Sequence, residues 1–213
     1  PNSIESWNPE TSDLIKTLYL PSSDDSWPWL GGLSVDDSGS LVAGILDGKV
    51  LLWDAGSGKL LRSFDPGGRL GDCLYCGAGA ISLSPSAGLL AVVGDAPVVI
   101  LVDPSTGTIG DELATEGRRV EMVSFNADGT LLATASYLSD TRYALRVWDT
   151  NTYDVVFERT GTVDRRHFPR FAFSADGQRL AVSSDTRLEL FDLVGGRQVL
   201  QFAESESPWF RAL

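Results

Sequence analysis

The stretch Phe125–Thr152, FNADGTLLATASYLSDTRYALRVWDTNT, decides the fold of this 213-residue chain. Its short apolar runs are separated by turn-forming clusters, a pattern typical of antiparallel strands. The clusters Asn126–Gly129 and Asp149–Thr152 are rich in residues whose short side chains hydrogen-bond their own backbone. We therefore expect strands over residues 131–136 and 144–148, joined by a polar loop.

The same pattern recurs before and after this stretch. The residue that follows each predicted third strand is Asn8, Asp54, Asp103, Asp149 or Asp192, at spacings of 46, 49, 46 and 43 residues. Each full period contains four short strand patterns. Periodicity of this length with four strands per unit indicates the blades of a β-propeller.

Two pairs of residues place these units in a family. Trp53–Asp54 and Trp148–Asp149 each end a predicted third strand, Phe191–Asp192 and Trp7–Asn8 are near matches, and Val102–Asp103 keeps only the acid. The units resemble WD repeats, whose blades of about 40–45 residues carry Trp-Asp at this place. The resemblance covers nearly the whole chain.

One part of the family pattern is missing. No repeat has the Gly-His pair that usually precedes the first strand, and the single histidine, His167, lies one residue before Phe168 and does not align with it. The family's buried Asp-His-Ser/Thr-Trp network is therefore not expected. We expect apolar packing between neighbouring sheets to hold the blades together, with Trp7, Trp53 and Trp148 completing the third strands.

The repeats predict the organisation of the chain. We expect an all-β fold, a β-propeller of four-stranded antiparallel blades, with four complete blades and partial blades at both ends. The expected units are a partial blade at 1–30, blades at about 31–78, 79–118, 119–168 and 169–207, and the start of another at 208–213. The resemblance implies part of a larger propeller, because six to eight blades are typical; a self-closed small ring is the alternative.

Composition excludes some partners. The chain is 43% apolar and 22% charged, and its formal net charge of −12 disfavours nucleic acid or an anionic membrane as the main partner. No apolar run reaches the roughly 20 residues of a membrane-spanning helix. The longest, Leu89–Val102, is interrupted by Asp95 and Pro97. We expect no nucleic-acid partner and no membrane insertion.

The candidate binding residues gather on one face. In an antiparallel meander, the loops between strands two and three and the segments between blades emerge at the same end. Trp29, Arg119, His167 and Trp209 occupy one equivalent position just before the first strand and should ring the mouth of the channel. Aromatic and arginine side chains often anchor interfaces. Alternatively, Trp29 and Trp209 fill gaps between blades.

Positive charge is concentrated in the segments before the third and fourth blades. These segments carry Arg118, Arg119, Arg165, Arg166 and Arg170. A basic sector on an acidic protein suggests a docking site for an acidic or phosphorylated segment of a protein partner. Ordinary solvated loop charges are the alternative.

The third repeat carries about five extra residues between Ser136 and Trp148. Tyr137, Asp140 and Arg142 lie in or beside this insertion. Insertions in repeat folds often map to the binding face, which makes Tyr137 and Arg142 candidate partner-binding residues. A neutral variation in loop length is the alternative.

Chemistry-bearing motifs are few. Cys73 and Cys76 form a C-x-x-C, a weak candidate for a metal site because a zinc site needs about four ligands; plain thiols or a local disulfide are expected. No catalytic motif accompanies them, so we expect no cofactor and no catalysis. The sequence favours a non-catalytic protein-interaction scaffold. The alternatives are a regulatory or sensor module that binds a peptide or anionic ligand at the channel mouth, and an enzyme whose residues lie outside this chain.

Overall fold

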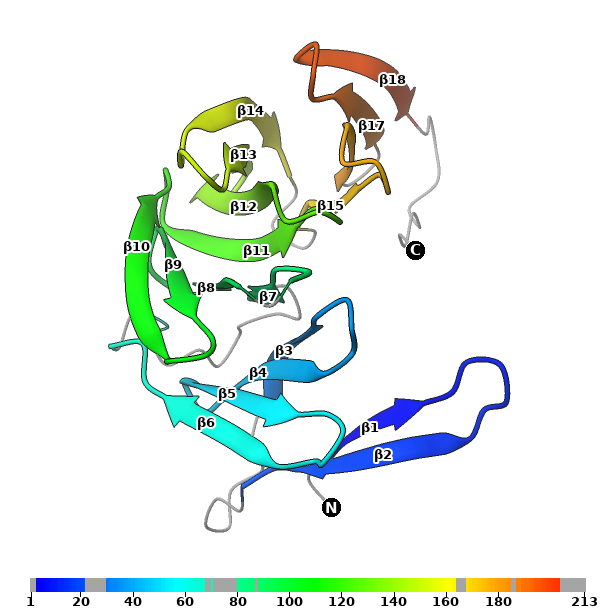
Figure 1. Ribbon diagram of the computed structural model, residues 1–213. Coiled ribbons are helices and arrows are strands. Elements are labelled where there is room, and N and C mark those ends of the chain that lie inside the picture. The colour runs from blue at the N-terminus through cyan, green and yellow to red at the C-terminus, as the bar shows by residue number, and fades with distance from the viewer. Residues whose placement is uncertain are drawn as a thin grey trace.

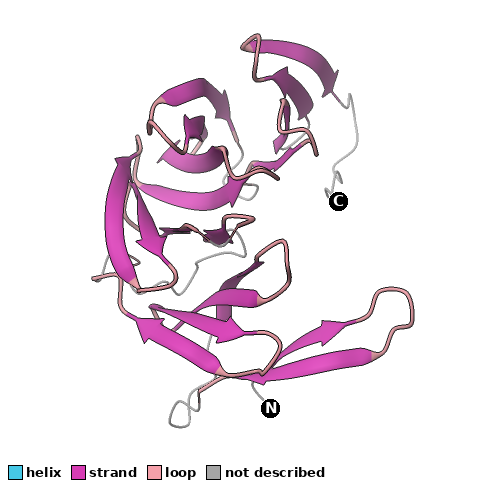
Figure 2. Cartoon of the chain, in the orientation of Figure 1, coloured by secondary structure: helices cyan, strands magenta, loops and turns pink. Residues whose placement is uncertain are grey.

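The computed structural model contains only strands, turns and loops in the part of the chain that it describes (Figure 2). The described residues are 3–21, 30–67, 70, 80–86, 88–163, 168–184 and 187–203. Among them, no helix is long and apolar enough to cross a membrane.

Four sheets of four strands each, with all neighbours antiparallel, confirm the predicted blades. The first blade contains β3 (Leu30–Val35), β4 (Leu41–Leu46), β5 (Lys49–Asp54) and β6 (Leu60–Phe64), and the second contains β7 (Ile81–Leu83), β8 (Leu90–Val93), β9 (Val98–Asp103) and β10 (Thr108–Ala114). The third contains β11 (Arg119–Phe125), β12 (Leu131–Ser139), β13 (Arg142–Asp149) and β14 (Val155–Thr162), and the fourth contains β15 (Arg170–Phe173), β16 (Arg179–Ser184), β17 (Arg187–Asp192) and β18 (Arg197–Ala203). An outer hairpin of β1 (Ser3–Trp7) and β2 (Leu14–Tyr19) precedes them.

The blades follow one another around an arc, as the blades of a propeller do (Figure 1). The first strand of each blade lies on the inner side of the arc and the fourth strand on the outer side. Strand β7 contacts both β3 and β11, the first strands of its two neighbours. The all-β propeller architecture predicted from the repeats is therefore confirmed.

Apolar side chains fill the spaces between neighbouring sheets. One buried cluster spans the first three blades, and a second joins the third blade to the fourth, where the rings of Phe157 and Phe191 lie 5.2 Å apart. Trp53 and Trp148 are buried, as predicted. Trp7 lies on the two-stranded outer hairpin and is 54% exposed, so in the described chain it does not have the buried place predicted for it.

The acid after each third strand closes a turn. The side-chain oxygen of Asp149 accepts hydrogen bonds from the backbone N–H groups of Asn151 at 2.8 Å and Thr152 at 3.1 Å. Asn8, Asp103 and Asp192 do the same in their own turns, and Asp54 accepts one such bond, from the N–H of Ser57. Hydrogen bonds from the Ser57 and Ser105 hydroxyls hold the pKa values of Asp54 and Asp103 below their ordinary range. The repeat was therefore recognisable through a side chain that the turn requires.

The insertion in the third blade is not a loop. Strand β12 continues past residue 136 and strand β13 begins before residue 144, with Tyr137 opposite Tyr143 and Ser139 opposite Arg142. Only two residues therefore turn the chain. The polar loop expected between residues 136 and 144 is wrong. Tyrosine and serine side chains interrupt the apolar pattern, but the backbone pairing is unaffected by them, and a bulge between Tyr137 and Ser139 accommodates the extra residue.

Candidate functional site

Gly117 brings the segment before β11 against the end of β12. Its φ is +100°, a conformation that favours glycine, and a Cβ atom there would lie 2.0 Å from the carbonyl oxygen of Tyr137. The adjacent Arg118 N–H donates a hydrogen bond to that carbonyl at 2.8 Å. The start of the blade and the β12–β13 hairpin are thereby fixed side by side.

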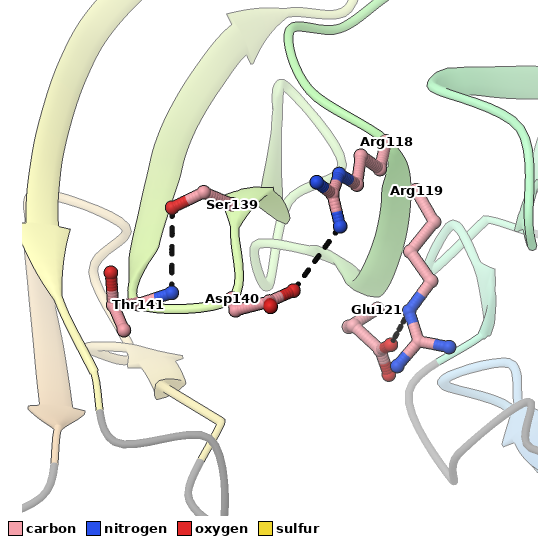
Figure 3. A network of polar contacts seen from close by, with 6 residues as sticks. All are labelled: Arg118, Arg119, Glu121, Ser139, Asp140 and Thr141. Atoms are coloured by element: carbon pink, nitrogen blue, oxygen red, sulfur yellow. Dashed lines mark hydrogen bonds and ion pairs between the residues drawn. The ribbon is translucent and has the colours of Figure 1, made fainter.

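Arg118 reaches from this segment to the tip of the hairpin. Its guanidinium lies 3.1 Å from Asp140 Oδ1, and the two side chains point toward each other (Figure 3). Both side chains are about half exposed or more, at 68% and 49%, so the pair contributes at most about 1 kcal/mol to stability. The Thr141 N–H donates to Ser139 Oγ at 3.4 Å and orders the same turn.

Arg119, the next residue, is directed to the other side. It forms an ion pair with Glu121 on the same strand (Figure 3). Its guanidinium carbon also lies 5.3 Å from the centroid of the Tyr137 ring, within cation–π range. The same ring also packs edge-on against Phe168, at 4.6 Å between centroids. Tyr137 is therefore held between a cation and a second aromatic side chain.

These side chains surround a surface hollow of about 420 Å³. We call its lining residues the docking cluster: Arg118, Arg119, Tyr137, Ser139 and Asp140. The cluster combines a rigid aromatic ring, two guanidinium groups, a hydroxyl and a carboxylate. Such a surface can hold a short polar peptide segment through hydrogen bonds and stacking.

Acidic side chains beside the docking cluster balance part of its positive charge. They were not among the predicted binding residues. Burial raises the pKa of Glu121 above its ordinary value, and the nearby Asp95 raises it further, against the opposing effect of Arg119 and Arg170. The pairing of Arg119 with Glu121 could have been found in the sequence, because residues two apart on a strand face the same way. The pairing of Arg118 with Asp140 could not, since it depends on how the hairpin extends.

The structure brings three of the predicted binding residues together: Arg118, Arg119 and Tyr137. Arg142 is exposed at the start of β13 and is not among the residues that line the hollow. The other candidates lie outside the described residues: Trp29, Arg165, Arg166, His167, Trp209, Cys73 and Cys76. In the described ranges, no three His, Cys, Asp or Glu side chains come together in a way that could hold a metal ion.

Comparison with known proteins supports the resemblance. No protein-family model matches the chain. A curated relative, the WD repeat-containing protein SL1-17 of Schistosoma mansoni, is 28% identical over 205 residues, which are 93% of this chain and 61% of the relative. The chain therefore spans about three fifths of the length of that relative.

A solved structure gives the same fold. A chain of the crystal structure of the mitotic checkpoint complex matches 96% of this chain and 59% of its own length, with a TM-score of 0.72 and 17% sequence identity. At this identity the likeness concerns the fold alone. The resemblance to WD-repeat β-propellers is confirmed by these two findings together.

Proposed function

We propose that this chain, which resembles the WD-repeat β-propellers, is a non-catalytic scaffold that binds another protein. The partner binds the face formed by the segments between blades and the loops between second and third strands, which we call the inter-blade face. The docking cluster is the observation that carries the proposal. It lies where the segment before a blade meets the β12–β13 hairpin, and its lining includes a tyrosine and two arginines, one of which is within cation–π range of the ring. Tyrosine and arginine are among the residues that contribute most binding energy at protein interfaces.

The chemistry of the cluster favours a partner segment that carries acidic or phosphorylated residues. Arg118 keeps 68% of its side chain exposed although it pairs with Asp140. An incoming carboxylate or phosphate can replace Asp140 as the partner of this guanidinium, with bidentate geometry. The structural neighbour is a chain of the mitotic checkpoint complex, which is a multiprotein complex. This also supports a protein partner.

The second candidate, a regulatory module that binds an anionic ligand at the channel mouth, has weaker support. Arg119 and Arg170 lie close enough to Glu121 for their charges to act on it, but so does the carboxylate of Asp95. The Arg119 side chain is 38% exposed and paired with Glu121, so it offers less open positive charge to a small anion than Arg118, which is 68% exposed. The activity and partners of a longer protein that contained this chain are likewise proposals.

Isolation of partners with variants of the cluster tests the proposal. Tagged wild-type protein, Arg118→Gln and Tyr137→Ala are used to isolate partners from cells of the source organism, and recovery is quantified by mass spectrometry. Arg179→Gln, an exposed arginine at the opposite end of a blade, is the matched control. We expect partners that bind wild type and the control but are depleted with both cluster variants. Equal recovery with correctly folded cluster variants would contradict the proposal.

A further inference from the structure

A second hollow, of about 350 Å³, lies between the third and fourth blades. Its lining comes from β13 and the end of β14 on one side and from the facing ends of β16 and β17 on the other. It shares no lining residue with the docking cluster. The proposed partner surface therefore does not account for it.

A glycine shapes the third-blade wall of this hollow. Gly161 on β14 lies opposite Tyr143 on β13, and a Cβ atom at position 161 would come within 2.5 Å of the tyrosine ring. Only glycine leaves room for the ring to lie across β14. Tyr143 is only 1% exposed and lines the hollow, and its hydroxyl is a hydrogen-bond partner of Ser184, which also lines the hollow.

Two guanidinium groups face the same space. Arg159 lies 3.8 Å from Glu189 and 5.8 Å from the centroid of the Phe191 ring, which together orient it. Arg187 is exposed at the start of β17, and within the described residues it forms no ion pair. Two cations against one carboxylate leave the wall with an excess of positive charge.

Hydroxyl groups add neutral donors around these charges. Tyr143, Thr160, Thr162 and Ser184 all line the hollow. Arginine guanidinium groups match the planar oxygen pair of a carboxylate or phosphate, and hydroxyl donors can satisfy the remaining lone pairs. The volume lies at the lower end of the range for small-ligand sites.

We propose that this hollow is a binding site for an oxyanion group, either a phosphate or a carboxylate, held by Arg159 and Arg187 with the Tyr143 hydroxyl as an added donor. The site is independent of the docking cluster. The group can belong to a phosphorylated residue or to an acidic side chain. Two probes, inorganic phosphate and acetate, distinguish these sources.

Titration with inorganic phosphate and, separately, acetate tests the site. The Nε–H resonances of the arginine side chains are followed by NMR at constant ionic strength, with chloride replaced by the probe. We expect saturable shifts of Arg159 and Arg187, read separately from any shift of Arg118 or Arg119 in the docking cluster. Saturation by phosphate alone identifies a phosphate site, and saturation by acetate as well identifies a general oxyanion site.

Three variants show whether these residues cause the effect. Arg187→Gln should weaken probe binding about tenfold, the loss of one charge-assisted hydrogen bond, and Tyr143→Phe should weaken it less. Arg179→Gln, at the other end of β16, should bind as wild type does. Shifts that grow linearly with either probe, or equal binding by Arg187→Gln, would overturn the proposal.

Discussion

The indole of Trp148 and the indole of Trp53 occupy the same place in two blades but differ in one hydrogen bond. Trp148 Nε1 donates to Thr134 Oγ1 at 3.2 Å in a buried site. Gly44 replaces Thr134 in the first blade, and Trp53 Nε1 is buried with no partner in the described chain. A Cβ atom at position 44 would lie 3.2–3.3 Å from three neighbouring side chains, which would have to shift to admit a threonine.

Thr134→Val should therefore destabilise the protein, because it leaves the Trp148 N–H without an acceptor while the side-chain volume stays the same. We expect the free energy of unfolding to fall by about 1–3 kcal/mol, measured by urea denaturation. In a Trp148→Phe background the same change should have little effect, since no N–H is present. An equal loss in both backgrounds would show that this hydrogen bond is not the cause.

Glu121 should make stability depend on pH. Burial, with Asp95, raises its pKa above the ordinary value of 4.5. Between that value and the raised one, the folded protein holds more protons than the unfolded chain, so stability falls as pH rises. Glu121→Gln should remove this fall. The stability of the variant relative to wild type should therefore increase from acidic to neutral pH. Urea denaturation over that range measures it, and parallel pH profiles would refute the assignment.

At the scale of the strand, serines connect the inner edges of neighbouring blades. The N–H of Leu83 on β7 donates to Ser34 Oγ on β3 at 2.8 Å, and the N–H of Phe125 on β11 donates to Ser82 Oγ on β7 at 3.2 Å. Ser124 has the equivalent place in β11, but its hydroxyl donates to the carbonyl of Phe125 at 3.2 Å. An inner edge strand needs such acceptors because its outward N–H groups have no next strand.

Ser82→Ala should cost about 1–3 kcal/mol of unfolding free energy, because the buried N–H of Phe125 loses its acceptor. Ser124→Ala is the matched control and should cost less, since it supports no other blade. Both are compared by urea denaturation. A larger loss for Ser124→Ala than for Ser82→Ala would contradict this role of the serines.

The strands and their turns were predictable because each turn needs a particular side chain. The acids after the third strands recur for that reason, and the blades follow from their spacing. The extension of β12 and β13 was not predictable, since Tyr137 and Ser139 give no apolar alternation although their backbone pairs fully. The docking cluster was predicted only in part: Arg118, Arg119 and Tyr137 were chosen, but the pairing with Asp140 depends on that extension.

At the scale of the whole molecule, both ends of the arc expose large apolar side chains. Ile15 and Tyr19 on the outer hairpin are 63% and 71% exposed, and Phe202 on β18 is 57% exposed. These strands lie at opposite ends of the arc (Figure 1). We propose that further blades, or another protein segment, cover both surfaces, as in a larger propeller.

The 213-residue chain alone should then self-associate through these surfaces. Light scattering after size-exclusion chromatography should show a mass that rises with concentration, and Ile15→Lys with Phe202→Lys should reduce it. Val156→Lys, on an exposed outer strand within the arc, is the control and should not. A monomer at every concentration would contradict the proposal.

The central claim, that the inter-blade face binds a protein partner through the docking cluster, is tested most directly by the affinity of one recovered partner. Isothermal titration calorimetry is carried out with wild type, Arg118→Gln, Asp140→Asn and the control Arg179→Gln. We predict that Arg118→Gln weakens binding about tenfold and that the control binds as wild type does. Asp140→Asn should not weaken binding, because it frees Arg118 for the partner. Unchanged affinity for a correctly folded Arg118→Gln would contradict the account.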